Sequence, residues 1–148
     1  MKFDAMFQPI QIGPVTVKNR FVVPPMGNNF ANTDGTMSEQ SVAYYRERAK
    51  GGFGLITIEA TVVHKGAKGG PRKPRLYDDS TIESFKKVVD ACHAEGAKVS
   101  VQLQNAGPEG NAKNAGAPIT AATSIPAACG RDIPRELSTE EVYELVKG

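Results

Sequence analysis

Three short apolar segments of this sequence end abruptly in residues that could line a binding site. The segments are residues 21–23, 55–58 and 99–103, and the residues in or directly after them are apolar, small or amide-bearing: Pro24, Pro25, Met26, Gly27, Ala60 and Gln102. In a parallel sheet, all three ends would open on one face, which is the face where enzymes of this architecture carry out chemistry. Such residues offer apolar, backbone and amide contacts to a ligand, and we expect no catalytic side chain among them.

Glu59 and the two histidines are further candidates for chemistry. Glu59 lies in an apolar segment and could serve as a general base, but we favour a buried carboxylate that is paired with a cation to stabilise this end of the sheet. His64 and His93 lie too far apart in the pattern to suggest a metal site, and we predict none.

Two cysteines and a cluster of cations also have alternative interpretations. Cys92 fits the core of a helix, whereas Cys129 falls in a long loop, and together they form no disulfide framework or metal spacing. The cations are Lys65, Lys68, Arg72, Lys73 and Arg75. They could attract an anionic acyl-CoA, or they could simply belong to a solvated loop, which we favour.

The elements that must position these residues can be predicted from the pattern. Ile10 and Ile12 alternate with polar residues, Gly13 begins a turn, and Val15 and Val17 alternate again, which predicts a hairpin over residues 8–20. The three apolar segments then follow as buried strands. Residues 27–35, 64–79 and 106–137 are rich in polar residues, glycine, alanine or proline, and we expect them to be loops.

Three helices are predicted from caps and apolar stripes. Ser38 is a candidate N-cap for a helix to about residue 50, with Val42, Tyr45 and Ala49 on its apolar face. Residues 80–83 and 138–141 both match a capping box. The first box would open a helix whose buried face carries Ile82, Phe85, Val88, Val89 and Cys92. The second would open a helix that carries Val142, Leu145 and Val146.

Bulk composition excludes several classes of protein. The chain has 148 residues, 40% hydrophobic content and a net charge of +2, which is the composition of one ordinary globular domain. No basic tract interleaved with aromatic residues marks a nucleic-acid binder. No apolar run is long enough to span a membrane, and the N-terminus lacks a secretory signal. We therefore expect a cytoplasmic protein that binds neither nucleic acid nor a membrane.

Alternation of apolar strands with amphipathic helices predicts an α/β protein with a parallel sheet. Several motifs within this pattern resemble the Old Yellow Enzyme-like NADH:flavin oxidoreductases, in particular the branch of 2-enoate and 2,4-dienoyl-CoA reductases. The residues that carry the likeness lie in ranges 17–20, 23–27, 44–52, 55–61 and 98–107. The resemblance implies a (β/α)₈ barrel capped by the N-terminal hairpin, with residues 1–148 forming only the first, incomplete portion of a single FMN-binding domain.

The same resemblance implies a site for FMN at the carboxyl ends of the strands. Pro24, Pro25, Met26 and Gly27 would line the flavin after the first strand, and Ala60 would lie beside it after the second. Gln102 would hydrogen-bond the pyrimidine edge of the ring, because an amide both donates and accepts. Asn28 and Asn29 would contact substrate, or they would serve only the chemistry of a turn.

Two positions depart from the motif of the third strand. The family commonly has His and Arg where this sequence has Asn105 and Pro108. The resemblance also places a substrate-binding pair, a proton-donor Tyr, the loops that hold the flavin phosphate and the iron–sulfur cysteines in later segments. A 4Fe-4S cluster and FAD would accordingly belong to a longer parent protein.

These inferences lead to one functional expectation and two alternatives. We expect part of an ene-reductase that moves hydride from NAD(P)H through FMN to the activated C=C bond of an enoate, enone or dienoyl-CoA. We expect the isolated chain to be inactive and able to self-associate through its open sheet edges. The alternatives are a non-catalytic fragment that folds only with a complementing chain, and an unrelated phosphate-binding barrel enzyme.

Overall fold

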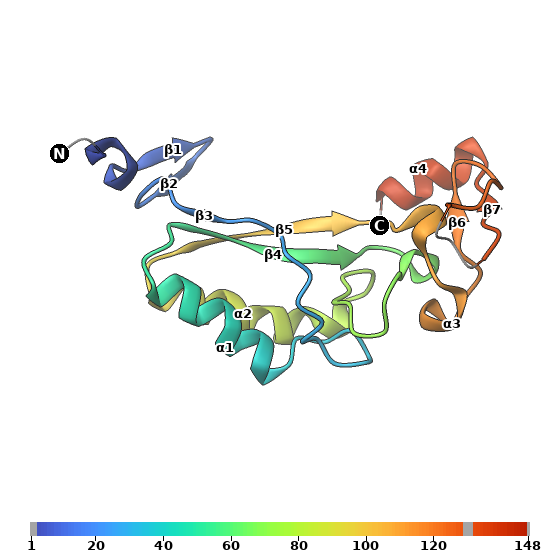
Figure 1. Cartoon of the computed structure of the whole chain (residues 1–148), viewed down its shortest axis with the longest axis horizontal. Coiled ribbons are helices and arrows are strands. Elements are labelled where there is room, and N and C mark those ends of the chain that lie inside the picture. Colours follow the sequence, from blue (N-terminus) through green and yellow to red (C-terminus); the bar gives the residue numbers. More distant parts are fainter. Residues whose placement is uncertain (1–2, 129–131, 148) are drawn as a thin grey trace.

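The computed structural model describes residues 3–128 and 132–147. After the 3₁₀ turn η1 (Asp4–Phe7), strands β1 (Ile10–Ile12) and β2 (Val15–Val17) pair antiparallel. Gly13 has φ +54 at the turn between them, a conformation that glycine adopts without steric cost. The predicted hairpin is therefore confirmed, and it lies at one end of the molecule (Figure 1).

The central sheet has three parallel strands in the order β3–β4–β5. They are β3 (Val22–Val23), β4 (Leu55–Val62) and β5 (Lys98–Gln104). This is the order and direction predicted from the three apolar segments. Strand β4 is the longest of the three, and its place in the middle explains why it is the most buried.

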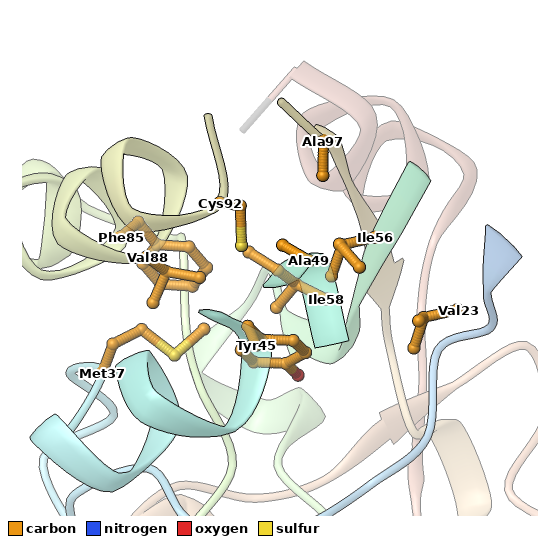
Figure 2. Close-up of a cluster of buried hydrophobic side chains, with 10 residues drawn as sticks. All are labelled: Val23, Met37, Tyr45, Ala49, Ile56, Ile58, Phe85, Val88, Cys92 and Ala97. Atoms are coloured by element: carbon orange, nitrogen blue, oxygen red, sulfur yellow. The ribbon is translucent and has the colours of Figure 1, made fainter. Parts of the chain in front are cut away.

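Helices α1 (Glu39–Lys50) and α2 (Ile82–Ala94) cover one face of this sheet (Figure 1). The core lies between them and the strands (Figure 2). Its buried side chains are Val23, Met37, Tyr45, Ala49, Ile56, Ile58, Phe85, Val88, Cys92 and Ala97. The predicted stripes of both helices are thus largely confirmed, because residues three or four apart share one face of a helix.

The two helices begin differently. At α1, the Ser38 hydroxyl accepts a hydrogen bond from the Ser41 amide at 3.1 Å, as predicted for an N-cap. At α2, the predicted capping box of residues 80–83 does not form, because the Ser80 hydroxyl bonds the Asp78 carboxylate instead. A 3₁₀ turn, η3 (Asp79–Thr81), consequently precedes α2. Ile82 becomes the first residue of the helix and is 50% exposed, so its predicted burial was wrong.

Residues 106–137 contain more structure than the predicted loop. They form η4 (Gly107–Glu109), α3 (Ala112–Ala115) and the short parallel pair β6 (Thr120–Ala121) and β7 (Arg135–Glu136). Two-residue strands and a single helical turn have almost no periodicity, which is why the sequence did not reveal them. Cys129 lies outside the described residues.

The segment then enters α4 (Thr139–Lys147) through the predicted second capping box. The Ser138 amide donates to Glu141 Oε2 at 2.9 Å, and the Glu141 amide donates to Ser138 Oγ at 3.3 Å. Within the described ranges, no helix is both long and apolar enough to cross a bilayer.

Candidate functional site

The carboxyl ends of the three strands bring most of the predicted site residues to one end of the sheet. Val23, the last residue of β3, pairs with Ile56 near the start of β4, and Pro24 follows it directly. Between β4 and β5, the register shifts after Ile58 and resumes at Thr61. Two residues of β4, Glu59 and Ala60, therefore stand opposite Gln102 alone, which is a β-bulge.

Gln102 lies on the face of the sheet opposite the helices. Val99 and Val101 pack against the core, and successive side chains of a strand alternate between faces. On this second face, Ser100 and Thr57 form a hydrogen bond of 3.0 Å between their hydroxyls. Gln102 is exposed, and its side-chain amide makes no hydrogen bond with any residue in ranges 3–128 and 132–147.

The segment after β3 presents an apolar surface to solvent. Met26 is 50% exposed, Pro24 and Gly27 are also exposed, and Pro25 and Ala60 are half-buried. A ligand that covered the Met26 side chain would remove apolar surface from water, which is favourable.

These residues fit an isoalloxazine ring in their chemistry. A flat ring with an apolar face and a polar edge needs apolar, closely approachable contacts and a group that both donates and accepts. The exposed Met26 side chain and the Gly27 backbone offer the first, and the Gln102 amide offers the second. The role of each residue in binding FMN stays a prediction.

Asn28 and Asn29 form a turn. Asn28 Oδ1 accepts from the Phe30 amide at 2.8 Å, and Asn28 Nδ2 donates to the Tyr45 hydroxyl at 3.4 Å. Asn29 has φ +58, and asparagine is among the few residues that tolerate this left-handed conformation. The geometry supports the turn interpretation of both residues, while their contact with substrate remains a prediction.

Glu59 is the buried, paired carboxylate that we favoured from the sequence. It is 2% exposed, and its Oε2 lies 3.2 Å from Lys73 Nζ. Its backbone amide donates to the Tyr45 hydroxyl at 3.0 Å. Burial, with a further contribution from the Glu59 charge, raises the pKa of Tyr45 to about 12. The sequence pattern indicated neither a polar role for Tyr45 nor a partner for Lys73.

Three other cations of the polar loop bind backbone carbonyls of the loop that follows β3. Lys68 Nζ donates to Thr33 O at 3.0 Å and Arg72 Nε to Ala31 O at 3.0 Å, and Arg75 Nε donates to Asp34 O at 2.6 Å. Burial, together with the charge of Arg75, lowers the pKa of Lys68. The cations thus connect two loops at the carboxyl ends of neighbouring strands, a role that neither of our two alternatives anticipated.

The two departures from the family motif serve local structure. Asn105 Oδ1 accepts from the Gly107 amide at 3.0 Å, which turns the chain after β5. Pro108 lies in the first turn of η4, where its missing N–H leaves no hydrogen bond unmade.

A pocket of about 420 Å³ lies at the other end of the sheet and does not include the predicted site. Its lining residues are Phe7, Asn19, Phe21, Gly51, Gly52 and Phe53. Among the described residues, no group of three or more His, Cys, Asp or Glu side chains could hold a metal ion.

Comparison with known proteins agrees with this architecture. The chain is 34% identical to the NADH oxidase of Thermoanaerobacter brockii over 147 residues, which are 98% of this chain and 23% of that protein. Among solved structures, 2-naphthoyl-CoA reductase in complex with 2-naphthoyl-CoA matches with a TM-score of 0.90 and 30% identity, over 97% of this chain and 24% of that one. The Old Yellow Enzyme homologue from Zymomonas mobilis matches with a TM-score of 0.86 and 26% identity, over 97% of this chain and 42% of that one.

The chain thus spans between about a quarter and two-fifths of the length of these relatives. Its fold is that of the N-terminal part of their (β/α)₈ barrel, as predicted. The family model for NADH:flavin oxidoreductases and NADH oxidases matches residues 5–148. The chain therefore belongs to the NADH:flavin oxidoreductase / NADH oxidase family.

Proposed function

We propose that this chain forms the ring-binding part of the FMN site of an ene-reductase. The chemistry that FMN supplies when bound is the transfer of a hydride from NAD(P)H to the β-carbon of an activated alkene. The residues of this chain bind and orient the ring. Membership in the flavin oxidoreductase family supports the choice of cofactor.

Each part of the site has a role in this proposal. Gln102 pairs with the pyrimidine edge of the ring, because its amide is exposed and uncommitted among the described residues. Pro24, Met26, Gly27 and Ala60 pack along the ring and exclude water from it. The proton that completes the reduction must come from a group outside this set, since none of these side chains is an acid.

The observation that carries the proposal is the bulge that places Gln102 opposite Ala60, beside the segment that follows β3. The uncommitted side-chain amide of β5 and the exposed apolar segment after β3 thus lie at the carboxyl ends of parallel strands, on either side of β4. Ligands bind at this edge of α/β sheets.

The substrate class is proposed more broadly than the cofactor. We propose a small enoate, enone or dienoyl thioester as substrate in the cytoplasm, with NADH or NADPH as the reductant. Of the cations that could attract an acyl-CoA, Lys68, Arg72 and Arg75 are already bonded to carbonyls. Lys65 is exposed and remains available for such a role.

We further propose that the 148-residue chain alone holds the flavin weakly and reduces no enone. Half of the ring would face water, which weakens every polar contact to the other half. The outer strands β3 and β5 of the three-stranded sheet also present edges that could pair with another copy or with a complementing chain.

Flavin binding tests the proposal directly. We expect the fluorescence of riboflavin and of FMN to be quenched when either is titrated with this chain. The two flavins should bind with similar affinity, because the proposed contacts are to the ring and not to the phosphate. Gln102→Ala should weaken both by about 1–3 kcal/mol, the cost of one lost hydrogen bond to a polar edge.

The matched control is Gln40→Ala, which makes the same chemical change at an exposed position of α1. Both flavins should be lost on dialysis. Equal affinity of the Gln102→Ala and Gln40→Ala variants would remove Gln102 from the site. Flavin that survives dialysis and turns over an enone would contradict the expectation of an inactive chain.

A further inference from the structure

A buried ion pair between Glu59 and Lys73 lies against the segment after β3 that is proposed to contact the flavin. The Glu59 side chain is 3% exposed and the Lys73 side chain 20%, and they approach to 3.2 Å. A carboxylate so deeply buried is tolerable only when a cation or several donors compensate it. In this chain Lys73 provides the compensating charge from a loop 14 residues away.

The same carboxylate holds the backbone of the loop after β3. Glu59 Oε2, which binds Lys73, also accepts a hydrogen bond from the Asn28 amide at 3.3 Å. Gly27 lies so close to the pair that a Cβ at this position would come within 2.7 Å of Lys73 Nζ and 3.6 Å of Glu59 Oε2. The Gly27–Asn28 backbone therefore rests on both members of the ion pair.

Helix α1 fixes the arrangement from the other side. The Tyr45 hydroxyl accepts from the Glu59 amide at 3.0 Å and from Asn28 Nδ2 at 3.4 Å. Its ring is one of the core side chains that Figure 2 shows. Because the core holds Tyr45, its hydroxyl provides a fixed point to which both Glu59 and Asn28 are attached.

We propose that Glu59 is a positioning residue for the flavin ring. Its carboxylate, whose charge is balanced by Lys73, fixes the Gly27–Asn28 backbone in the position where it can pack against the ring. This inference rests on the proposed FMN site. Glu59 itself does not touch the ring. It acts through the Gly27 and Asn28 backbone.

A positioning role of Glu59 and a general contribution to stability predict different patterns of amide exchange. If Glu59 only stabilised the fold, its loss would accelerate amide exchange in the strands and in the loop by the same factor. If it positions the loop, exchange of the Asn28 amide should accelerate selectively while the amides of Ile58 and Val101 in the sheet keep their protection.

The test combines hydrogen exchange by NMR with riboflavin titration of the full 148-residue chain. In Glu59→Gln, an acceptor for the Asn28 amide remains but the charge of Lys73 is uncompensated. We expect exchange at Asn28 to become about tenfold faster and riboflavin affinity to fall by a similar factor, since the uncompensated Lys73 cation lies against the Gly27–Asn28 backbone and would displace it. The double variant Glu59→Gln/Lys73→Met restores neutrality and should return both values to within about threefold of the wild type.

A matched control exists on the helices. Glu39 and Lys87 form an ion pair of 3.3 Å with side chains that are 85% and 63% exposed. The double variant Glu39→Gln/Lys87→Met makes the same two substitutions on the surface and should change neither measurement.

The exchange measurement tests the role of Glu59, and the riboflavin titration of the wild-type chain tests the proposed function on which that role rests. Unchanged exchange at Asn28 in Glu59→Gln, or uniform acceleration throughout the sheet, would overturn the positioning role. A double variant that is no better than Glu59→Gln would overturn the role of charge balance. A wild-type chain that does not bind riboflavin would count against the proposed function, and the exchange comparison would still decide the role of Glu59.

Discussion

The hydroxyl of Tyr45 gives the sharpest test of how the candidate site is held together. It accepts two hydrogen bonds, one from the backbone amide of Glu59 and one from the side chain of Asn28, while its ring packs in the core. Tyr45→Phe removes the acceptor and keeps the ring. The variant therefore isolates the polar contribution from the packing contribution.

The cost of this change follows from burial. Glu59 is 2% exposed, so its amide would lose its partner where water cannot easily replace it. Leaving a buried donor unsatisfied costs about 1–3 kcal/mol. The second bond is long at 3.4 Å and contributes less. We expect the free energy of unfolding to fall by about 2 kcal/mol, which corresponds to a decrease in Tm of about 6 °C for a domain of this size.

The same substitution should change the response to alkali. The pKa of Tyr45 is raised from 10.0 to about 12 in the folded chain. Between these values the folded state holds a proton that the unfolded state has released, so stability falls as pH rises through this window. The stabilisation from this group is fully present below pH 10. Its loss between pH 10 and 12 amounts to about 2–3 kcal/mol at most, and Tyr45→Phe should lack this part of the decline.

Urea unfolding at pH 7 and at several pH values above 10, followed by circular dichroism, would measure both effects. Tyr143→Phe is the matched control, since Tyr143 is 64% exposed on α4 and loses only a hydroxyl in water. The reasoning would be refuted if Tyr45→Phe were as stable as Tyr143→Phe at pH 7. A parallel alkaline decline in both variants would show that Tyr45 is not the group that couples stability to alkali.

Three further predictions concern other parts of the chain. Gly35→Ala should destabilise the protein by more than about 1 kcal/mol, because Gly35 has φ +87 and a Cβ would meet Arg75 Cγ at 2.5 Å. Gly13, at φ +54, has no atom within 4 Å of a Cβ, so Gly13→Ala should lower the stability measured by thermal unfolding less. Burial raises the pKa of the Cys92 thiol to about 11, so iodoacetamide at pH 8 should leave the peptide that contains Cys92 unmodified until the chain unfolds, as mass spectrometry would show. The Arg135 guanidinium, which pairs with Glu141, lowers the pKa of Glu141 to about 2. Amide protection at the start of α4 should therefore persist above pH 4.5 and decline as pH falls toward 2. Protection that is constant over this range would contradict the assignment.

Several features of the fold could be predicted because they depend on residues close together in the sequence. The hairpin, the three strands and α1 follow from alternation, from the spacing of apolar residues and from the Ser38 cap. The capping box at residues 138–141 formed as expected, but the equivalent pattern at residues 80–83 did not. There, the Ser80 hydroxyl donates to the Asp78 carboxylate instead, which is another local arrangement that the sequence permits.

The candidate site was predicted in part. Strand order places Pro24, Ala60 and Gln102 at one edge of the sheet, and this follows from parallel pairing of the three segments. The bulge that sets Gln102 opposite both Glu59 and Ala60 could not be predicted, because no residue type marks it.

The sequence by itself determined the parallel architecture, the family and the end of the sheet where the candidate residues gather, since these depend on periodicity and on short motifs. Only the tertiary structure decided what holds that site. Tyr45, Glu59 and Lys73 come from a helix, a strand and a loop. Tyr45 and Glu59 contact each other and Asn28, and Lys73 contacts Glu59, because strand register and helix packing bring distant segments within 3.0 to 3.4 Å. A carboxylate buried among apolar strands must find a cation wherever the fold can supply one. The sequence shows that Glu59 needs such a partner, and the three-dimensional arrangement of the loops determines that it is Lys73.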